Sequence, residues 1–152
     1  MVTARRRNAG YTVIEMLMVM VVVSVLAAIV YIRVGPTLER ARVRGAASLL
    51  ATDLQYAQTL AAQHRTPMVI SVNVGAKSYQ IASRGGVTVY RTRDFGAGSE
   101  YGLGEFSAAP VAVEVFPNSI VAQSATYTVG LNGYRRQVTF SRAGQIRVAT
   151  IP

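Results

Sequence analysis

Cysteine is absent from this 152-residue chain, and histidine occurs once, as His64. Without cysteine the fold has no disulfide, and thiol nucleophiles and cysteine-based metal sites are excluded. One histidine without a local signature does not make a Ser-His-Asp constellation. His64 lies at the end of a predicted helix, where positive charge is favourable, so we expect a capping or surface role. The sequence therefore predicts a protein that is not an enzyme.

Acidic residues are also few, with seven aspartates and glutamates in the whole chain. Six of them follow the first apolar run, and they are dispersed rather than arranged as an EF-hand-like series of oxygen ligands. Asp94, Glu100 and Glu105 fall in one predicted loop, so a calcium ion held by these three is an alternative. The glycines of that loop do not follow a strand-to-helix phosphate fingerprint. We expect neither a metal nor a cofactor.

The longest apolar run covers residues 16–32, where no residue is charged and Ser24 is the only polar side chain. With residues 11–14 in front, the run reaches about 20 residues, and a helix of that length spans the ~30 Å hydrocarbon core of a bilayer. Lipid favours a helix despite the many valines, because a helix pairs every backbone amide. We therefore predict a membrane-spanning helix over residues 11–33.

A short basic segment precedes this run. Residues 1–10 contain Arg5, Arg6 and Arg7 and no apolar core, and the small residue Gly10 lies before the hydrophobic helix. A secretory signal instead has its small-residue cleavage site after the apolar segment. Cleavage after Gly10 would therefore leave the hydrophobic helix in the mature protein.

The hexapeptide Gly-Tyr-Thr-Val-Ile-Glu at residues 10–15 resembles the class III signal of type IV prepilins and type II secretion pseudopilins. The resemblance implies that a prepilin peptidase cleaves between Gly10 and Tyr11 and that the new amine is N-methylated. It also implies that Glu15 pairs with the N-terminal amine of a neighbouring subunit in a filament, where opposite charges attract strongly. Tyr11 departs from the family's usual phenylalanine but keeps an aromatic ring. An ordinary single-pass anchor, with Glu15 at the headgroup boundary, is the alternative.

The charge distribution predicts the orientation. The dense block of residues 5–7 favours a cytoplasmic N-terminus, although Arg33 follows the apolar run on its other side. The globular part then lies in the periplasm, outside the bacterial inner membrane. The chain is thus expected to be a single-pass protein.

The pattern of residues 34–65 predicts a second helical segment, which is amphipathic. Leu50, Leu54, Ala57 and Ala61 recur with helical spacing and form a stripe that we expect to pack on a sheet. Pro36 is predicted to kink this helix or to mark its first soluble turn. Most of the arginines Arg40, Arg42 and Arg44 lie off the stripe, which favours a solvated face of the helix. The alternative is that they form a basic collar near the membrane or a filament contact.

Residues 66–152 predict an antiparallel β domain, because alternating β-branched segments are separated by turn residues. Asn132-Gly133 is a strong hairpin signal. Residues 95–109, rich in glycine and small residues, are predicted to form a long exposed loop. The predicted strands are 68–74, 79–83, 87–93, 111–116, 120–129, 137–141 and 145–151. The sequence thus predicts an α+β, pilin-like fold, a long N-terminal helix packed on an antiparallel sheet.

Two later stretches narrow the resemblance to the GspH/FimT branch. Residues 49–69 resemble its helix-to-strand segment, and residues 138–144, with Phe140 and Gly144, resemble its late hairpin. Many major type IV pilins carry a C-terminal disulfide, so the lack of cysteine favours a minor subunit. Membership of this branch implies a non-catalytic minor pseudopilin near the tip of a type II secretion pseudopilus. Its partners would be other pseudopilins or pilins, the prepilin peptidase and the inner membrane.

A FimT-like minor pilin of a type IV pilus, which binds DNA for uptake, is the alternative. Some such pilins bind DNA through a basic C-terminal motif, and the basic residues of this region are Arg135, Arg136, Arg142 and Arg147. On one face they could bind phosphates, with affinity that falls steeply with salt. Residues 144–147 carry one arginine rather than a cluster, so scattered solvated arginines are the simpler interpretation.

Overall fold

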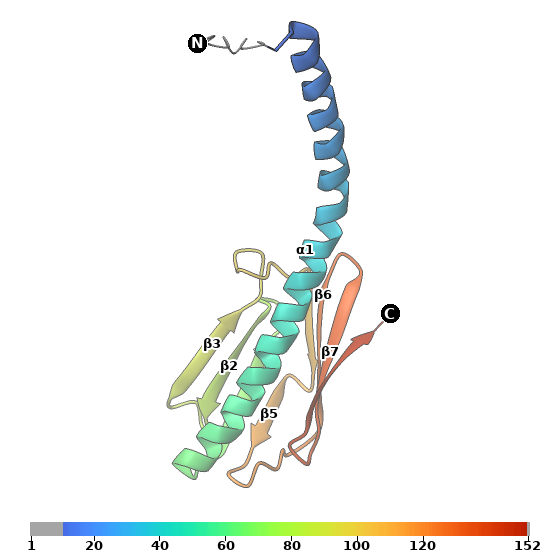
Figure 1. The fold of residues 1–152 in the computed structure, drawn as a ribbon. Coiled ribbons are helices and arrows are strands. Elements are labelled where there is room, and N and C mark those ends of the chain that lie inside the picture. The colour runs from blue at the N-terminus through green and yellow to red at the C-terminus, as the bar shows by residue number, and fades with distance from the viewer. Residues whose placement is uncertain (1–10, 152) are drawn as a thin grey trace, which may run out of the picture. The chain divides into compact units, whose positions relative to one another are not determined.

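The computed structural model describes residues 11–151, and within that range the side chains of all but residues 31–34. The predicted leader, residues 1–10, lies outside the described residues. The chain divides into two compact units, Met1–Thr37 and Leu38–Pro152. One helix, α1 (Val13–His64), contributes to both units (Figure 1).

The first part of α1 is apolar and exposed on all sides. Thr12 precedes the helix, and its side-chain oxygen accepts a hydrogen bond from the backbone N–H of Glu15 at 3.3 Å, as an N-cap does. The large apolar side chains from Met16 to Val30 are 53–69 % exposed. In the described part of the chain, α1 is the one helix long and apolar enough to cross a membrane.

The second part of α1 buries the predicted stripe. Leu50 and Ala57 are fully buried, as are Val43 and Ala46 one or two turns earlier. Burial of one Val or Leu side chain stabilises the folded state by about 1.5–3 kcal/mol. This stripe is therefore the main source of the free energy that packs the helix on the β domain. The helix continues through Pro36 and ends at His64, after which Arg65 adopts a positive φ of 52°.

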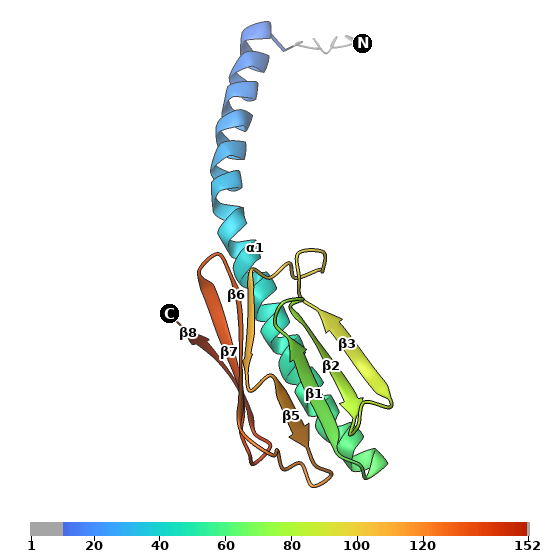
Figure 2. The ribbon, with the colours of Figure 1, turned by 180° about the vertical axis from the view of Figure 1, so that it is seen from behind.

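Two antiparallel sheets of four strands each pack against this part of α1 (Figure 2). The first sheet has the order β3-β2-β1-β5 and the second has the order β4-β6-β7-β8. The predicted α+β arrangement is confirmed, with two sheets in the β domain. The strands are β1 (Met68–Asn73), β2 (Ser78–Ser83), β3 (Val89–Asp94), β4 (Glu105–Ala109), β5 (Ala112–Val115), β6 (Ala125–Leu131), β7 (Tyr134–Phe140) and β8 (Ile146–Ile151).

The prediction of a long exposed loop over residues 95–109 is wrong. Its last five residues form β4, which pairs with β6. Phe95, Leu103 and Phe106 are buried in the core, and the rings of Phe95 and Phe106 meet edge to face with centroids 5.3 Å apart. The sequence did not reveal this buried segment, because its three large apolar residues are spaced irregularly and have neither helical nor strand periodicity. The glycines between them also favoured the interpretation as a loop.

The hairpin at Asn132-Gly133 is confirmed. These residues have φ angles of 49° and 83°, and Leu131 pairs with Tyr134 directly across the turn. The flanking strands run up to this turn, so β6 ends later and β7 begins earlier than predicted. The amide of Asn132 also donates a hydrogen bond of 2.6 Å to Glu39, which fastens the hairpin to α1.

Gly144 closes the turn between β7 and β8 against α1. Its φ is +79°, and an added Cβ would lie 2.4 Å from the Ser119 carbonyl oxygen and 2.7 Å from Nε2 of Gln58. The same Gln58 nitrogen donates a 2.8 Å hydrogen bond to the Gly144 carbonyl. Only glycine fits here, both for its backbone angle and for this close approach.

We expect Gly144→Ala to destabilise the β domain by about 2–4 kcal/mol, because it combines an unfavourable φ with a backbone clash. Gly133→Ala is the matched control, since its φ is +83° but nothing lies within 4 Å of its added Cβ. Urea unfolding measures both. Equal losses in the two variants would contradict the importance of the close approach.

Candidate functional site

Glu15 lies in the first turns of α1 within an apolar surface. Its backbone N–H bonds to Thr12, whereas its carboxylate has no hydrogen-bond or ion-pair partner among residues 11–151. Tyr11 is 77 % exposed, and Gly10 lies outside the described residues. A carboxylate without a partner in an apolar segment needs one from elsewhere or must stay at a polar boundary.

The one polar side chain of the following run is satisfied within the helix. The Ser24 hydroxyl donates a hydrogen bond of 2.7 Å to the Met20 carbonyl, four residues earlier. The segment therefore offers its surroundings an apolar surface. Such a surface suits lipid or other apolar helices.

The four arginines considered for DNA binding are not brought together. Arg135 and Arg136 are neighbours on β7 and so point to opposite faces of the second sheet. Arg135 forms a 2.7 Å ion pair with Glu105, and the two side chains cross over Gly130, which pairs with both residues. Arg147 on β8 shares the face of Arg135 but pairs with Thr139, near the other end of β7, and Arg142 lies in the β7–β8 turn.

The acidic residues considered for calcium are not brought together either. In the described residues no group of three or more His, Cys, Asp or Glu side chains is placed to hold a metal ion. Glu105 is paired with Arg135, and Asp94 accepts a 2.6 Å hydrogen bond from the backbone N–H of Gly96. His64 is exposed and its ring packs on Tyr90, with centroids 5.1 Å apart.

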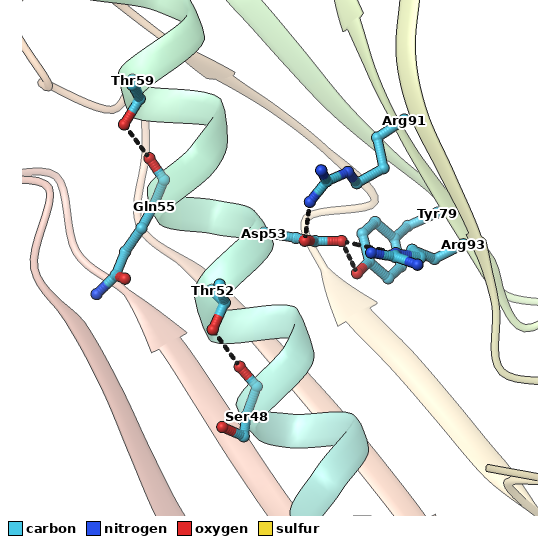
Figure 3. A network of polar contacts seen from close by, with 8 residues as sticks. All are labelled: Ser48, Thr52, Asp53, Gln55, Thr59, Tyr79, Arg91 and Arg93. Carbon is cyan, nitrogen blue, oxygen red and sulfur yellow. Dashed lines mark hydrogen bonds and ion pairs between the residues drawn. The ribbon is translucent and has the colours of Figure 1, made fainter. Parts of the chain in front are cut away.

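Asp53 forms a polar cluster that the sequence did not predict (Figure 3). Its carboxylate is fully buried on α1 and accepts hydrogen bonds from the Tyr79 hydroxyl at 2.7 Å, Arg91 at 2.5 Å and Arg93 at 3.1 Å. The Arg91 guanidinium also lies 4.1 Å from the ring centre of Tyr56. We name these four hydrogen-bonded residues the Asp53 cluster; they join α1 to β2 and β3.

The electrostatics of the Asp53 cluster follow from burial and charge. Burial, and then the hydrogen bond to Asp53, raise the pKa of Tyr79 well above its usual value. The hydrogen bond to Asp53 also raises the pKa of Arg93. A buried carboxylate that lost its partners would cost about 3–5 kcal/mol, so the cluster fixes how β3 lies against the helix.

The sequence held a signal for this cluster. Asp53 follows the stripe residue Leu50 by three positions and precedes Leu54 by one, so it lies on the buried side of the helix. Arg91 and Arg93 are two residues apart on β3, so their side chains point to the same face of the sheet. Their cross-strand partners on β2 are Ile81 and Tyr79. An acid inside an apolar stripe predicts a buried partner of opposite charge.

We expect Tyr79→Phe to destabilise the domain by about 1–3 kcal/mol, because the buried carboxylate loses a donor. Tyr127→Phe is the matched control, since Tyr127 is also fully buried but its hydroxyl has no hydrogen-bond partner within residues 11–151. That variant should be as stable as the wild type or more so. Urea unfolding compares them, and a larger loss in Tyr127→Phe would refute this assignment.

A second polar cluster lies where β7 and β8 meet α1. Tyr134 and Arg136 share the face of β7 that carries the buried Val138, and Thr150 pairs with Arg136 across the strands. Hydrogen bonding from Arg44 of α1, and then from Arg136, lowers the pKa of Tyr134 to about 8. We name these four residues, Arg44, Tyr134, Arg136 and Thr150, the Tyr134 cluster.

One tyrosine of the eight should therefore ionise near pH 8, and Arg44→Met should move that step toward the ordinary value of about 10. Because the pKa is lower in the folded state, the stabilisation from ionised Tyr134 is complete above about pH 10 and is lost as pH falls through about 8. A spectrophotometric titration of tyrosinate measures the step. The control is Arg42→Met, and an early step that survives in Arg44→Met would disprove the role of Arg44 in lowering this pKa.

Comparisons with known proteins agree with this geometry. A family profile described as the prokaryotic N-terminal methylation motif matches residues 5–31. No curated protein sequence matches the chain.

Solved structures of pilin-class proteins have the same fold. The type IV minor pilin FimU of Pseudomonas aeruginosa matches in two crystal forms, with TM-scores of 0.59 and 0.55 and identities of 24 % and 22 %. The matches cover 75 % and 70 % of this chain and 92 % and 91 % of FimU. The minor pseudopilin EpsH from the type 2 secretion system of Vibrio cholerae matches with a TM-score of 0.56 and 12 % identity, over 72 % of this chain and 97 % of EpsH. The chain is therefore pilin-like in its N-terminal motif and in its fold.

Proposed function

We propose that this chain is a minor subunit of a type II secretion pseudopilus, located at or near the tip and acting as a structural, non-catalytic component. The observation that carries the proposal is the exposed apolar part of α1, which begins with a carboxylate that has no partner within residues 11–151. An isolated soluble domain gains nothing from such a segment. A subunit that is stored in a membrane and then packs its helix against other helices requires it.

The proposed maturation follows from the N-terminal motif. Residues 1–10 are the leader, and prepilin peptidase cleaves between Gly10 and Tyr11, whose new amine is methylated. Residues 11–33 form the membrane and filament-core helix, residues 34–65 the amphipathic helix and residues 66–152 the β domain. In the inner membrane the N-terminus faces the cytoplasm and the β domain the periplasm. Glu15 then pairs with the amine of a neighbouring subunit and sets the register.

A type IV pilus is the second candidate for the same role. The likeness to FimU favours it, because FimU is a type IV minor pilin. Binding of DNA by this chain stays a prediction, and the division of Arg135, Arg136, Arg142 and Arg147 among two faces and a turn gives it no combined surface. Titration of the protein with duplex DNA at two salt concentrations would test it.

Glu15→Leu tests the proposed function. We expect this variant to insert into the membrane at least as well as the wild type, because a costly carboxylate is removed. It should nevertheless be missing from filaments, since the charge that registers subunits is lost. The measurement is the amount of the chain in sheared filaments against the amount in membranes, with Ser24→Ala as a control inside the same helix. Normal incorporation of Glu15→Leu would remove the registering role.

A further inference from the structure

The Tyr134 cluster and the Asp53 cluster contain the same donors. Each combines one tyrosine hydroxyl with two guanidinium groups, one cluster on the first sheet and the other on the second. In the Asp53 cluster all three donors meet a carboxylate. In the Tyr134 cluster the two guanidinium groups instead lie near the hydroxyl of Tyr134 and lower its pKa.

No carboxylate of the described chain serves the Tyr134 cluster. Neither Arg44 nor Arg136 has an ion pair with an acid among residues 11–151. Nε of Arg136 is buried and has no hydrogen-bond partner within that range. Glu39, the acid nearest to Arg44 along α1, accepts its hydrogen bond from Asn132. Two guanidinium groups near one hydroxyl, with no acid among residues 11–151 to pair with them, form an incomplete arrangement.

The cluster is also open to solvent on the side of β8. Arg44 and Thr150 are exposed, and β8 is the edge strand of the second sheet. Arg136 is half-buried on the neighbouring strand, directly opposite Thr150. A group arriving from solvent at the edge of β8 therefore meets the exposed Arg44 and Thr150, with the half-buried Arg136 beside Thr150.

We propose that the Tyr134 cluster binds a carboxylate supplied in trans, by an acidic side chain of a neighbouring filament subunit. The Asp53 cluster shows within the same molecule that this set of donors surrounds a carboxylate. A carboxylate has two oxygens and about four lone-pair positions, enough for both guanidinium groups and the tyrosine hydroxyl. The assignment to a neighbouring subunit rests on the proposed function, whereas the binding site itself does not.

The opposite pKa directions of the two tyrosines support this proposal. The hydroxyl of Tyr79 donates a hydrogen bond to a carboxylate and its pKa is raised, whereas Tyr134 faces cations that have no acid partner among residues 11–151, and its pKa is lowered to about 8. A carboxylate bound between the arginines would reverse the second effect. Tyr134 thereby reports occupancy of the site.

Thr150→Glu tests the site by supplying the carboxylate within the chain. Because Thr150 pairs with Arg136, we expect this variant to raise the Tm of the full-length protein in detergent by about 4 °C or more and to raise the pKa of Tyr134. Ala149→Glu is the matched control, since it adds the same charge on the opposite face of β8, where Ala149 pairs with Gln137. A Thr150→Glu protein no more stable than Ala149→Glu would overturn the proposal.

Acetate provides a second test without a new acidic residue. At constant ionic strength, replacing chloride by acetate should raise the Tm of the wild type and of Arg42→Met progressively, and by more than it raises the Tm of Arg44→Met. Equal responses of the two arginine variants, or no response in any protein, would overturn the site. Phosphate is the comparison anion, and a Tm difference between Arg42→Met and Arg44→Met that is larger in phosphate than in acetate would overturn the assignment to a carboxylate.

Filament incorporation separates this inference from the proposed function. Arg44→Met should be depleted from filaments while Arg42→Met is retained, because only the former loses a contact to the neighbour. Full incorporation of Arg44→Met would overturn the neighbouring subunit as the source of the carboxylate. Normal incorporation of Glu15→Leu would instead count against the proposed function and leave the acetate and Thr150→Glu results unaffected.

Discussion

The packing of α1 on the two sheets is the constraint on which the rest of the β domain depends. Both sheets turn their apolar faces toward one stripe of the helix, and this single core contains buried residues of α1 and of six strands. The stripe is rich in small residues such as Ala46, Ala57 and Ala61, which let the backbones of helix and strands approach closely. Gly144 makes a comparable approach at the end of the second sheet, where the β7–β8 turn meets Gln58.

Polar contacts then fix the orientation of α1 on the two sheets, which apolar packing alone does not determine because it is non-directional. The Asp53 cluster fastens the edge strand β3 to the helix, and the bonds Asn132–Glu39 and Gln58–Gly144 fasten the two ends of β7. Hydrophobic burial alone tolerates small rotations of a helix over a sheet, whereas a buried carboxylate with three donors does not. The Tyr134 cluster lies in the same seam but has no acid among residues 11–151 to complete it.

In the proposed function, the first part of α1 packs against other helices and the β domain presents distinct contacts. The first part of α1 carries few polar side chains apart from Glu15, which suits a helix that packs among similar helices. The β domain, together with the part of α1 that packs on it, carries both polar clusters and the edge strands. Differences between minor subunits of this fold are therefore expected there rather than in the helix.

The sequence by itself determined the elements whose signals are local. The apolar run, the helical stripe from Leu50 to Ala61 and the Asn132-Gly133 turn follow from composition and spacing, since each acts through neighbours along the chain. It did not determine the places of Phe95, Leu103 and Phe106, or the separation of Arg135 from Arg136 by the sheet. Only the tertiary structure decided that Asp53 bonds to Arg91 and Arg93 and that Arg44 lies near enough to Tyr134 to lower its pKa. These contacts join residues far apart in the chain, and their partners are selected by strand order and register, which local periodicity does not encode.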